Sequence, residues 1–147
     1  TDRMYWPFYV ACCEYDIPLC IQVGHTGPLL PSECGRPIYL DEVALTFPDL
    51  TILGTHNGDP WHDEMAILAW KHPNVYMEAS ARPARHWPDT IKKFAGGYGQ
   101  DKMIWATDYP LLPFKRTVQD VYDCGFSDEA TAKILRHNAA KVFKIND

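Results

Sequence analysis

Four polar residues with chemically useful side chains stand at the carboxyl ends of four short apolar runs. Gln22 and His56 end the first two runs, and Glu78 and Asp108 end the last two. Histidine and carboxylate side chains are natural ligands of Zn²⁺ or Mn²⁺, and they are also common general bases. His56 and Asp108 are therefore candidates for a metal-binding or acid–base pair. One alternative stays open: these strand ends are simply polar, and His56 and Asp108 cap the neighbouring helices.

The apolar runs predict parallel strands over 18–23, 51–56, 74–78 and 102–107, because strands buried on both faces are almost continuously apolar. Successive runs begin about 23 to 33 residues apart, which fits βαβ units with short connections. Helical patterns precede, separate and follow the runs, over 7–15, 38–47, 60–71, 88–95, 117–124, 127–135 and 138–145. Asp59 is expected to cap the 60–71 helix and Pro60 to lie in its first turn.

Strands that alternate with helices predict an α/β fold with a parallel sheet, either an open doubly wound sheet or part of a (β/α)₈ barrel. A full barrel needs roughly 250 residues, and this chain has 147. We therefore expect one domain, 1–147, that corresponds to half a barrel with additional C-terminal helices. Such a half would expose two open sheet edges and an apolar inner face, so a second copy or a missing N-terminal half should cover them.

Composition narrows the possible partners and the compartment. The net charge of −5 argues against a nucleic-acid surface or an anionic-membrane surface. No apolar run approaches the roughly 20 residues that span a bilayer, and the first residues do not resemble a secretion signal. The five cysteines form no Cys-x-x-Cys pair, which favours reduced thiols in the cytoplasm.

The segments around the strand ends resemble the amidohydrolase-related family, the "amidohydrolase 2" group of metal-dependent TIM-barrel enzymes. The similarity covers nearly the whole chain, and its most specific parts are the His-Asn-Gly at 56–58 and the Thr-Asp-Tyr-Pro at 107–110. Residues 21–28, 35–37, 40–44, 47–50, 71–76 and 134–140 also match. The resemblance implies the C-terminal half of the barrel and a small-molecule substrate, which is hydrolysed at a C–N or C–O bond or decarboxylated.

The resemblance also implies one divalent metal, most often zinc with manganese as the second choice. His56 would match the histidine that ends the sixth strand, and Asp108 the aspartate that follows the eighth strand and binds the metal or activates its water. His25 is a third candidate ligand, because Gln22 occupies the place where many members have a histidine. The His-x-His of the first strand occurs nowhere in this sequence.

Four further residues are candidates for substrate binding. Gln22 and Glu78 end strands, and Arg82 follows the third strand, where its guanidinium could pair with a substrate carboxylate. Trp61 is a candidate aromatic platform, although a packing role is the more ordinary one. Three functions stay open: a metal-dependent hydrolase, a decarboxylase of the same family, and a catalytically incomplete half barrel that serves in binding or assembly.

Overall fold

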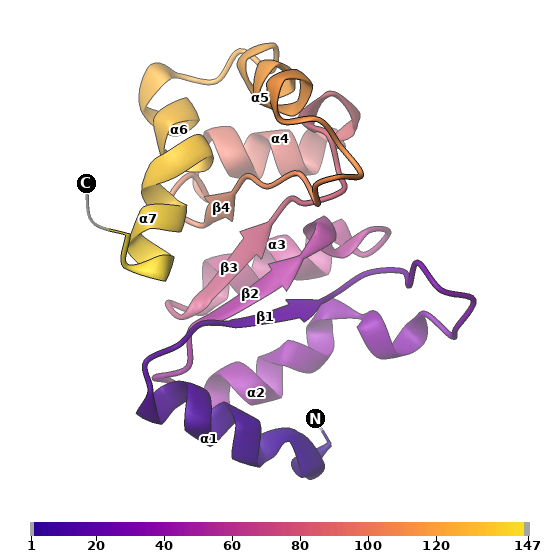
Figure 1. The fold of residues 1–147 in the computed structure, drawn as a ribbon, viewed down its shortest axis with the longest axis vertical. Helices are drawn as coiled ribbons and strands as arrows, with labels where there is room; N and C mark the ends of the chain where they lie inside the picture. Colours follow the sequence, from indigo (N-terminus) through magenta and orange to yellow (C-terminus); the bar gives the residue numbers. More distant parts are fainter. Residues whose placement is uncertain (1, 146–147) are drawn as a thin grey trace.

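The four apolar runs form one parallel sheet in the computed structural model, which describes residues 2–145. The strands are β1 (Leu19–Gln22), β2 (Ile52–Thr55), β3 (Val75–Glu78) and β4 (Met103–Ile104). They lie in the order β1-β2-β3-β4, and each neighbouring pair is parallel (Figure 1). The predicted α/β class is confirmed, and the carboxyl ends of all four strands meet at one edge of the sheet.

The helices alternate with the strands as predicted. The helix α1 (Trp6–Glu14) precedes β1, and the crossovers hold α2 (Leu40–Thr46), α3 (His62–Lys71) and α4 (Asp89–Gly96). After β4 follow α5 (Phe114–Tyr122), α6 (Asp128–Ala132), a π-helical turn (Lys133–His137) and α7 (Asn138–Phe143). In the part of the chain from residue 2 to 145, no helix is both long and apolar enough to cross a membrane.

Three strands end earlier than the sequence predicts, β1 by a single residue at Gln22. The run 102–107 contributes only Met103–Ile104 to β4. The chain leaves the sheet at Trp105, because the Trp105 backbone N–H donates to the carbonyl of Ile134 at 2.9 Å. His56, expected at the end of a strand, instead begins a 3₁₀ turn over His56–Gly58. Asp108 and His56 therefore lie in loops just beyond their strands.

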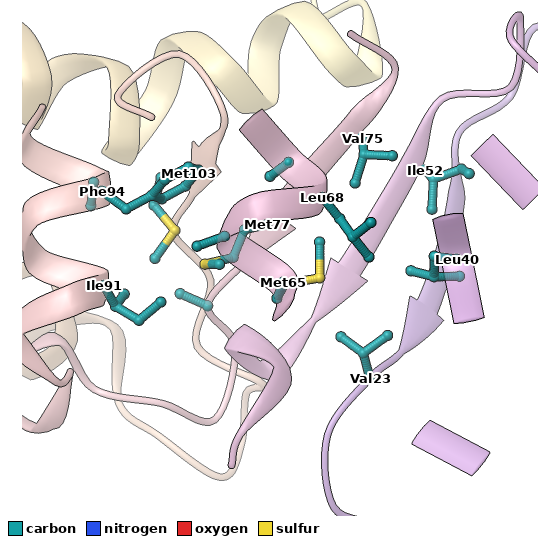
Figure 2. Packing of buried hydrophobic residues seen from close by; sticks show 14 of the residues in the cluster. Val23, Leu40, Ile52, Met65, Leu68, Val75, Met77, Ile91, Phe94 and Met103 are labelled. Atoms are coloured by element: carbon teal, nitrogen blue, oxygen red, sulfur yellow. The ribbon is translucent and has the colours of Figure 1, made fainter. Parts of the chain in front are cut away.

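The main core lies between the sheet and the helices that cover one of its faces. Alternate residues of a strand point to the same face, so every second strand residue enters this core. Figure 2 shows strand residues interleaved with side chains of α3 and α4. The members Ile52, Met65, Val75, Met77, Ile91, Phe94 and Met103 are fully buried. Burial of such apolar surface is the dominant favourable term in folding.

The opposite face of the sheet, which would point into a barrel, is partly covered by the chain's own end. Leu53, Tyr76 and Ile104 lie on this face and are buried, and Val142 and Ala139 of α7 pack against them. The expectation of a fully exposed inner face is therefore wrong. The pattern of short apolar runs could not reveal this, because the covering helix is remote in sequence from two of the three strands.

The two edges of the sheet differ. At β4, the Asn138 side-chain amide donates to the carbonyls of Met103 and Gln100, each at 2.7 Å. This edge, predicted to be open, is occupied by the helical extension. In the described part of the chain, nothing pairs with the outer side of β1. Beside it runs an apolar groove of about 450 Å³ between α1 and β1, lined by Tyr5, Phe8, Tyr15, Ile17 and Cys20 among others.

A partly exposed ion cluster between α2 and the end of α3 gives a first prediction. Oδ1 of Asp41 lies 2.6 Å from the buried imidazole of His72 and 2.6 Å from the Lys71 ammonium. Hydrogen bonds from Lys71 and His72 lower the pKa of Asp41. We expect Asp41→Asn to reduce the free energy of unfolding by about 1–3 kcal/mol at pH 7.

The lowered pKa sets the pH dependence of this effect. A carboxyl whose pKa is lower in the folded state stabilises the fold above its unfolded pKa of about 4, and that contribution disappears as the pH falls through the folded pKa. The difference between Asp41→Asn and wild type should therefore shrink below about pH 4. Urea denaturation at several pH values measures it, with the exposed Asp123→Asn as the control. A constant difference down to the lowest pH would contradict the assignment.

Candidate functional site

The loops that follow the strands close around one cavity of about 280 Å³. Five predicted site residues line it: Gln22 at the end of β1, His25 in the loop that follows, His56 after β2, Arg82 after β3 and Asp108 after β4. The structure thus brings together residues that lie up to 86 positions apart in the sequence. Imidazole, carboxylate, amide and guanidinium groups converge here, so the cavity offers ligands, proton carriers and an anion-binding group.

The backbone at this cavity adopts an unusual conformation at several of the same residues. His56 has φ 64°, the adjacent Asn57 has φ 59°, Ala81 has φ 56° and Asp108 has φ 58°. For residues other than glycine, the left-handed region costs roughly 1–2 kcal/mol each. Such residues concentrate at functional sites, where the surrounding structure holds them in place. The two predicted catalytic residues, His56 and Asp108, are both among them.

Gly24 fixes the position of His25. Gly24 has φ +96°, and a Cβ atom there would lie 2.5 Å from the backbone oxygen of Asp59. The close approach allows the His25 backbone N–H to donate to that same oxygen at 2.7 Å. The Gly24 backbone N–H donates to the carbonyl oxygen of Gly35, also at 2.7 Å. Gly24 is thus required both for its dihedral angle and for its lack of a side chain.

We expect Gly24→Ala to lower the free energy of unfolding by about 1–3 kcal/mol, because it places a β-carbon against backbone in the left-handed region. Thermal and urea denaturation would measure the loss. Gly27→Ala is the matched control in the same loop, since a Cβ there meets nothing within 4 Å. Equal stability of the two variants would refute the account.

A hydrogen-bonded chain leads from His56 into the protein. His56 Nδ1 lies 3.0 Å from both the backbone oxygen and the hydroxyl of Ser80. The Ser80 hydroxyl donates to one carboxylate oxygen of Glu78 at 2.8 Å, and the Ser80 backbone N–H donates to the other at 2.8 Å. Because the serine proton is committed to Glu78, its oxygen accepts from His56. We therefore assign the imidazole proton to Nδ1, which leaves Nε2 with a free lone pair.

Glu78, expected to contact substrate, is buried and does not line the cavity. Burial raises its pKa above the ordinary value, while the two hydrogen bonds from Ser80 act in the opposite direction. In this position the carboxylate orients Ser80 and, through it, the ring of His56. A histidine whose second nitrogen is held in this way is typical of metal ligands and general bases.

Asp59 is a residue whose role the sequence did not reveal. It was expected to cap α3, but α3 begins at His62 after an N-cap at Trp61, so that prediction is wrong. The left-handed turn at His56–Gly58 displaces the helix start, and the Asp59 carboxylate instead lies 3.1 Å from Nε of Arg82. Arg82 Nη2 is also within 3.2 Å of both ring nitrogens of His25.

Trp61, the remaining candidate for substrate binding, lies apart from this cavity. It lines a separate cleft of about 440 Å³ with Pro60, Glu64 and Thr90, among others. The Arg36 guanidinium lies 5.8 Å from the centre of its ring. Besides Asp59, the sequence reasoning also missed Ser80 and Asn57, and only their closeness to the strand ends could have singled them out.

The described residues of this chain do not by themselves complete a metal site. Between residues 2 and 145, no group of three or more histidine, cysteine or carboxylate side chains is arranged to hold a metal ion. A catalytic zinc usually has three protein ligands, and His25, His56 and Asp108 line the shared cavity without forming such a group. The hydrogen bonding of His56 fits a metal ligand, but the described residues at this cavity do not form a complete donor set.

Solved structures share this fold. An uncharacterised TIM-barrel protein from Bordetella bronchiseptica is 28% identical with a TM-score of 0.83, and the match covers 97% of this chain and 51% of that one. The manganese complex of 5-carboxyvanillate decarboxylase from Novosphingobium aromaticivorans is 19% identical with a TM-score of 0.74 (98% and 52% covered). 2,6-Dihydroxybenzoate decarboxylase from Rhizobium is 16% identical with a TM-score of 0.71 (97% and 56% covered).

These matches confirm the half-barrel architecture, since the chain spans about half the length of each of these structures. A comparison with curated proteins gives no match. The amidohydrolase family model, however, matches residues 1–145, which is almost the whole sequence. The parallel four-stranded sheet, whose strand ends converge on one cavity, agrees with this family match. The chain therefore belongs to the amidohydrolase family of the amidohydrolase 2 type.

Proposed function

We propose that this chain forms the C-terminal half of a metal-dependent hydrolase that cleaves a C–N or C–O bond in a small organic substrate. The observation that carries the proposal is the convergence of His56 and Asp108, both in left-handed backbone, on one cavity with Gln22, His25 and Arg82. A fold of this kind places its chemistry beyond the carboxyl ends of the strands, where these residues lie.

Each residue has a role that its contacts support. His56 would present Nε2 to the metal or to a water proton, since Nδ1 is held by Ser80. Asp108 is exposed at the cavity and would accept a proton or bind the metal. His25 is a third candidate ligand, and Arg82 would orient an anionic part of the substrate.

The proposed cofactor is a divalent metal, zinc first and manganese second. When bound, such an ion lowers the pKa of its water toward about 7 and so supplies hydroxide at neutral pH. The remaining ligands would come from the other barrel half, either in the same protein or in a second copy. The open outer side of β1 and its apolar groove are where we propose that this half packs.

A decarboxylase of the same family is the second candidate. Two of the similar structures are decarboxylases of aromatic acids, one of them with manganese. Arg82, with a guanidinium at the cavity, would suit a carboxylated substrate. The third candidate, a catalytically incomplete binding module, is favoured by the incomplete donor set.

The five cysteines support a cytoplasmic location as a further part of the proposal. All five are free thiols, although Cys20 and Cys34 are exposed. Free exposed thiols persist in a reducing compartment. We therefore propose that the protein acts in the cytoplasm.

The test combines elemental analysis of the purified chain with its mass in solution, measured on the same sample. About one zinc or manganese per assembled barrel, reduced in His56→Gln and Asp108→Asn but not in His137→Gln, would support a metal-dependent enzyme. A panel of esters, lactones, amides and benzoic acids then separates hydrolysis from release of CO₂. A metal-free protein without turnover, even after metal is added to the assembled barrel, would refute the enzyme proposal and favour the binding module.

A further inference from the structure

The loop that follows β1 carries two exposed leucines at the cavity of about 280 Å³. Gly27 and Pro28 of this loop form part of the cavity wall. The next two residues, Leu29 and Leu30, have relative exposures of 105% and 62%. Figure 1 shows the loop between β1 and α2 projecting beyond the carboxyl ends of the strands. In this conformation the tip of the loop leaves large apolar side chains in water.

The loop is a compact body on a narrow neck. At the neck, the Gly24 backbone N–H donates to the carbonyl oxygen of Gly35 at 2.7 Å. Inside the loop, the Thr26 hydroxyl lies 2.9 Å from the carbonyl oxygens of both Pro28 and Leu30. These bonds fix the shape of the tip without tying it to its surroundings.

Few interactions hold the loop in its present orientation. Within the described chain from 2 to 145, no hydrogen bond joins residues 26–32 to a residue outside 24–35. Residues 27–31 are all exposed. Segments with so few outside contacts are the ones that move at low cost in free energy. The loop can therefore change its orientation as a unit, with the neck as its hinge.

A second part of the cavity wall leads to a fixed apolar surface. Leu111, in the loop after β4, lines the cavity and is exposed. The exposed ring of Tyr109 stacks on that of Phe114, with 5.3 Å between the ring centres. Phe114 begins α5, and its ring lies 6.1 Å from that of Trp105. We call Tyr109, Leu111 and Phe114 the apolar shelf.

The floor between the loop tip and the apolar shelf is polar. It is formed by side chains from all four strand ends, namely Gln22, His25, His56, Arg82 and Asp108. Two apolar surfaces therefore border one polar cavity, and each is left in water while the loop stays in its present orientation. Contact between them would remove apolar surface from water and would cover the polar floor.

We propose that residues 26–32 form a lid that rotates about its neck and places Leu29 and Leu30 on the apolar shelf. Closure separates His56 and Asp108 from bulk water, as the lids of many enzymes do for their reacting groups. That closure serves a reaction rests on the proposed function. The closing motion itself does not.

Disulfide trapping tests the lid in the whole chain. Leu29→Cys and Leu111→Cys are combined after the two exposed native thiols are removed by Cys20→Ser and Cys34→Ser. The Leu29 side chain is fully exposed, so a bond to position 111 needs the loop to move. The control pair is Leu29→Cys with Leu45→Cys, because Leu45 is also an exposed leucine but lies on α2, away from the cavity.

In a glutathione buffer we expect the 29–111 pair to have an effective concentration at least about tenfold above that of the control pair. Mass mapping of peptides identifies the bonded cysteines, and circular dichroism confirms that each variant is folded. Leu30→Cys with Leu111→Cys is a second pair, which keeps the test decisive if the first variant does not fold. Equal effective concentrations for the shelf and control pairs would overturn the inference. So would disulfides of Leu29→Cys that form only between molecules, because the tip would then meet a second copy.

The trapping needs neither metal nor substrate, so it is independent of the proposed function. A lid that can be trapped on a chain without turnover would leave the lid standing while the proposed function fails. Where turnover is found, the 29–111 disulfide should lower it more than about tenfold, and a reductant should restore it. Unchanged turnover in the fully oxidised variant would refute the role of the lid at the reacting cavity.

Discussion

Replacing His56 with glutamine is expected to lower kcat/KM of the assembled enzyme by about 10³-fold, the usual contribution of a positioned proton carrier. Glutamine can still donate to Ser80, and it occupies a similar volume. It has no ring nitrogen with a free lone pair, so it cannot take up a proton, and it offers a metal only a neutral amide oxygen in place of Nε2. The measurement is turnover of the first substrate that the wild-type protein accepts.

The comparison with Ser80→Ala makes the role of His56 specific. That variant keeps the imidazole but removes the hydroxyl at 3.0 Å that accepts from Nδ1. A loss of about tenfold is expected, because the backbone oxygen of Ser80 still accepts from the ring. His137→Gln, at an exposed position in the helical extension, is the matched control and should retain full activity. Turnover of His56→Gln within threefold of wild type would exclude His56 from the chemistry.

The second large effect concerns stability. Asn138→Ala should reduce the free energy of unfolding by about 2–4 kcal/mol, because it removes two hydrogen bonds and leaves the carbonyls of Met103 and Gln100 without this donor. The side chain is buried, so water cannot readily replace it. Urea denaturation measures the change, and a decrease below 1 kcal/mol would mean that the edge of β4 does not depend on this amide.

A matched surface variant separates that effect from helix propensity. Gln119→Ala removes an exposed side-chain amide from α5, which donates to the Asp123 carboxylate at 2.8 Å. Its expected effect is within about 0.5 kcal/mol of wild type. If both alanine variants lost equal stability, the buried contacts of Asn138 would not be the cause.

The parts of the site that follow from strand periodicity could be predicted from the sequence. Gln22, His56 and Asp108 each follow an apolar run, and parallel strands bring such positions to one edge. The structure places all three at one cavity. Whether they bind metal or substrate stays a prediction.

The parts that depend on loop conformation could not be predicted. Asp59 before Pro60 has the ordinary appearance of a helix cap, and only the left-handed turn at His56–Gly58 redirects it toward Arg82. Glu78 ends a strand like the other candidates, but the turn after β3 brings Ser80 over its carboxylate. Alternation along a strand says on which face a residue lies, and it does not say what covers that residue.

The helical cover at β4 makes the growth of this sheet one-sided. A new strand could be added at β1 without breaking any existing bond, because nothing in the described chain pairs there. At β4, the carbonyl of Met103 and the N–H of Trp105 are already bonded to the helical extension. If two identical halves joined into a ring, β1 of each copy would have to pair with β4 of the other copy at both junctions. Ring closure by direct strand pairing must therefore exchange helical hydrogen bonds for strand hydrogen bonds, so that assembly and rearrangement of the C-terminal helices become a single coupled event.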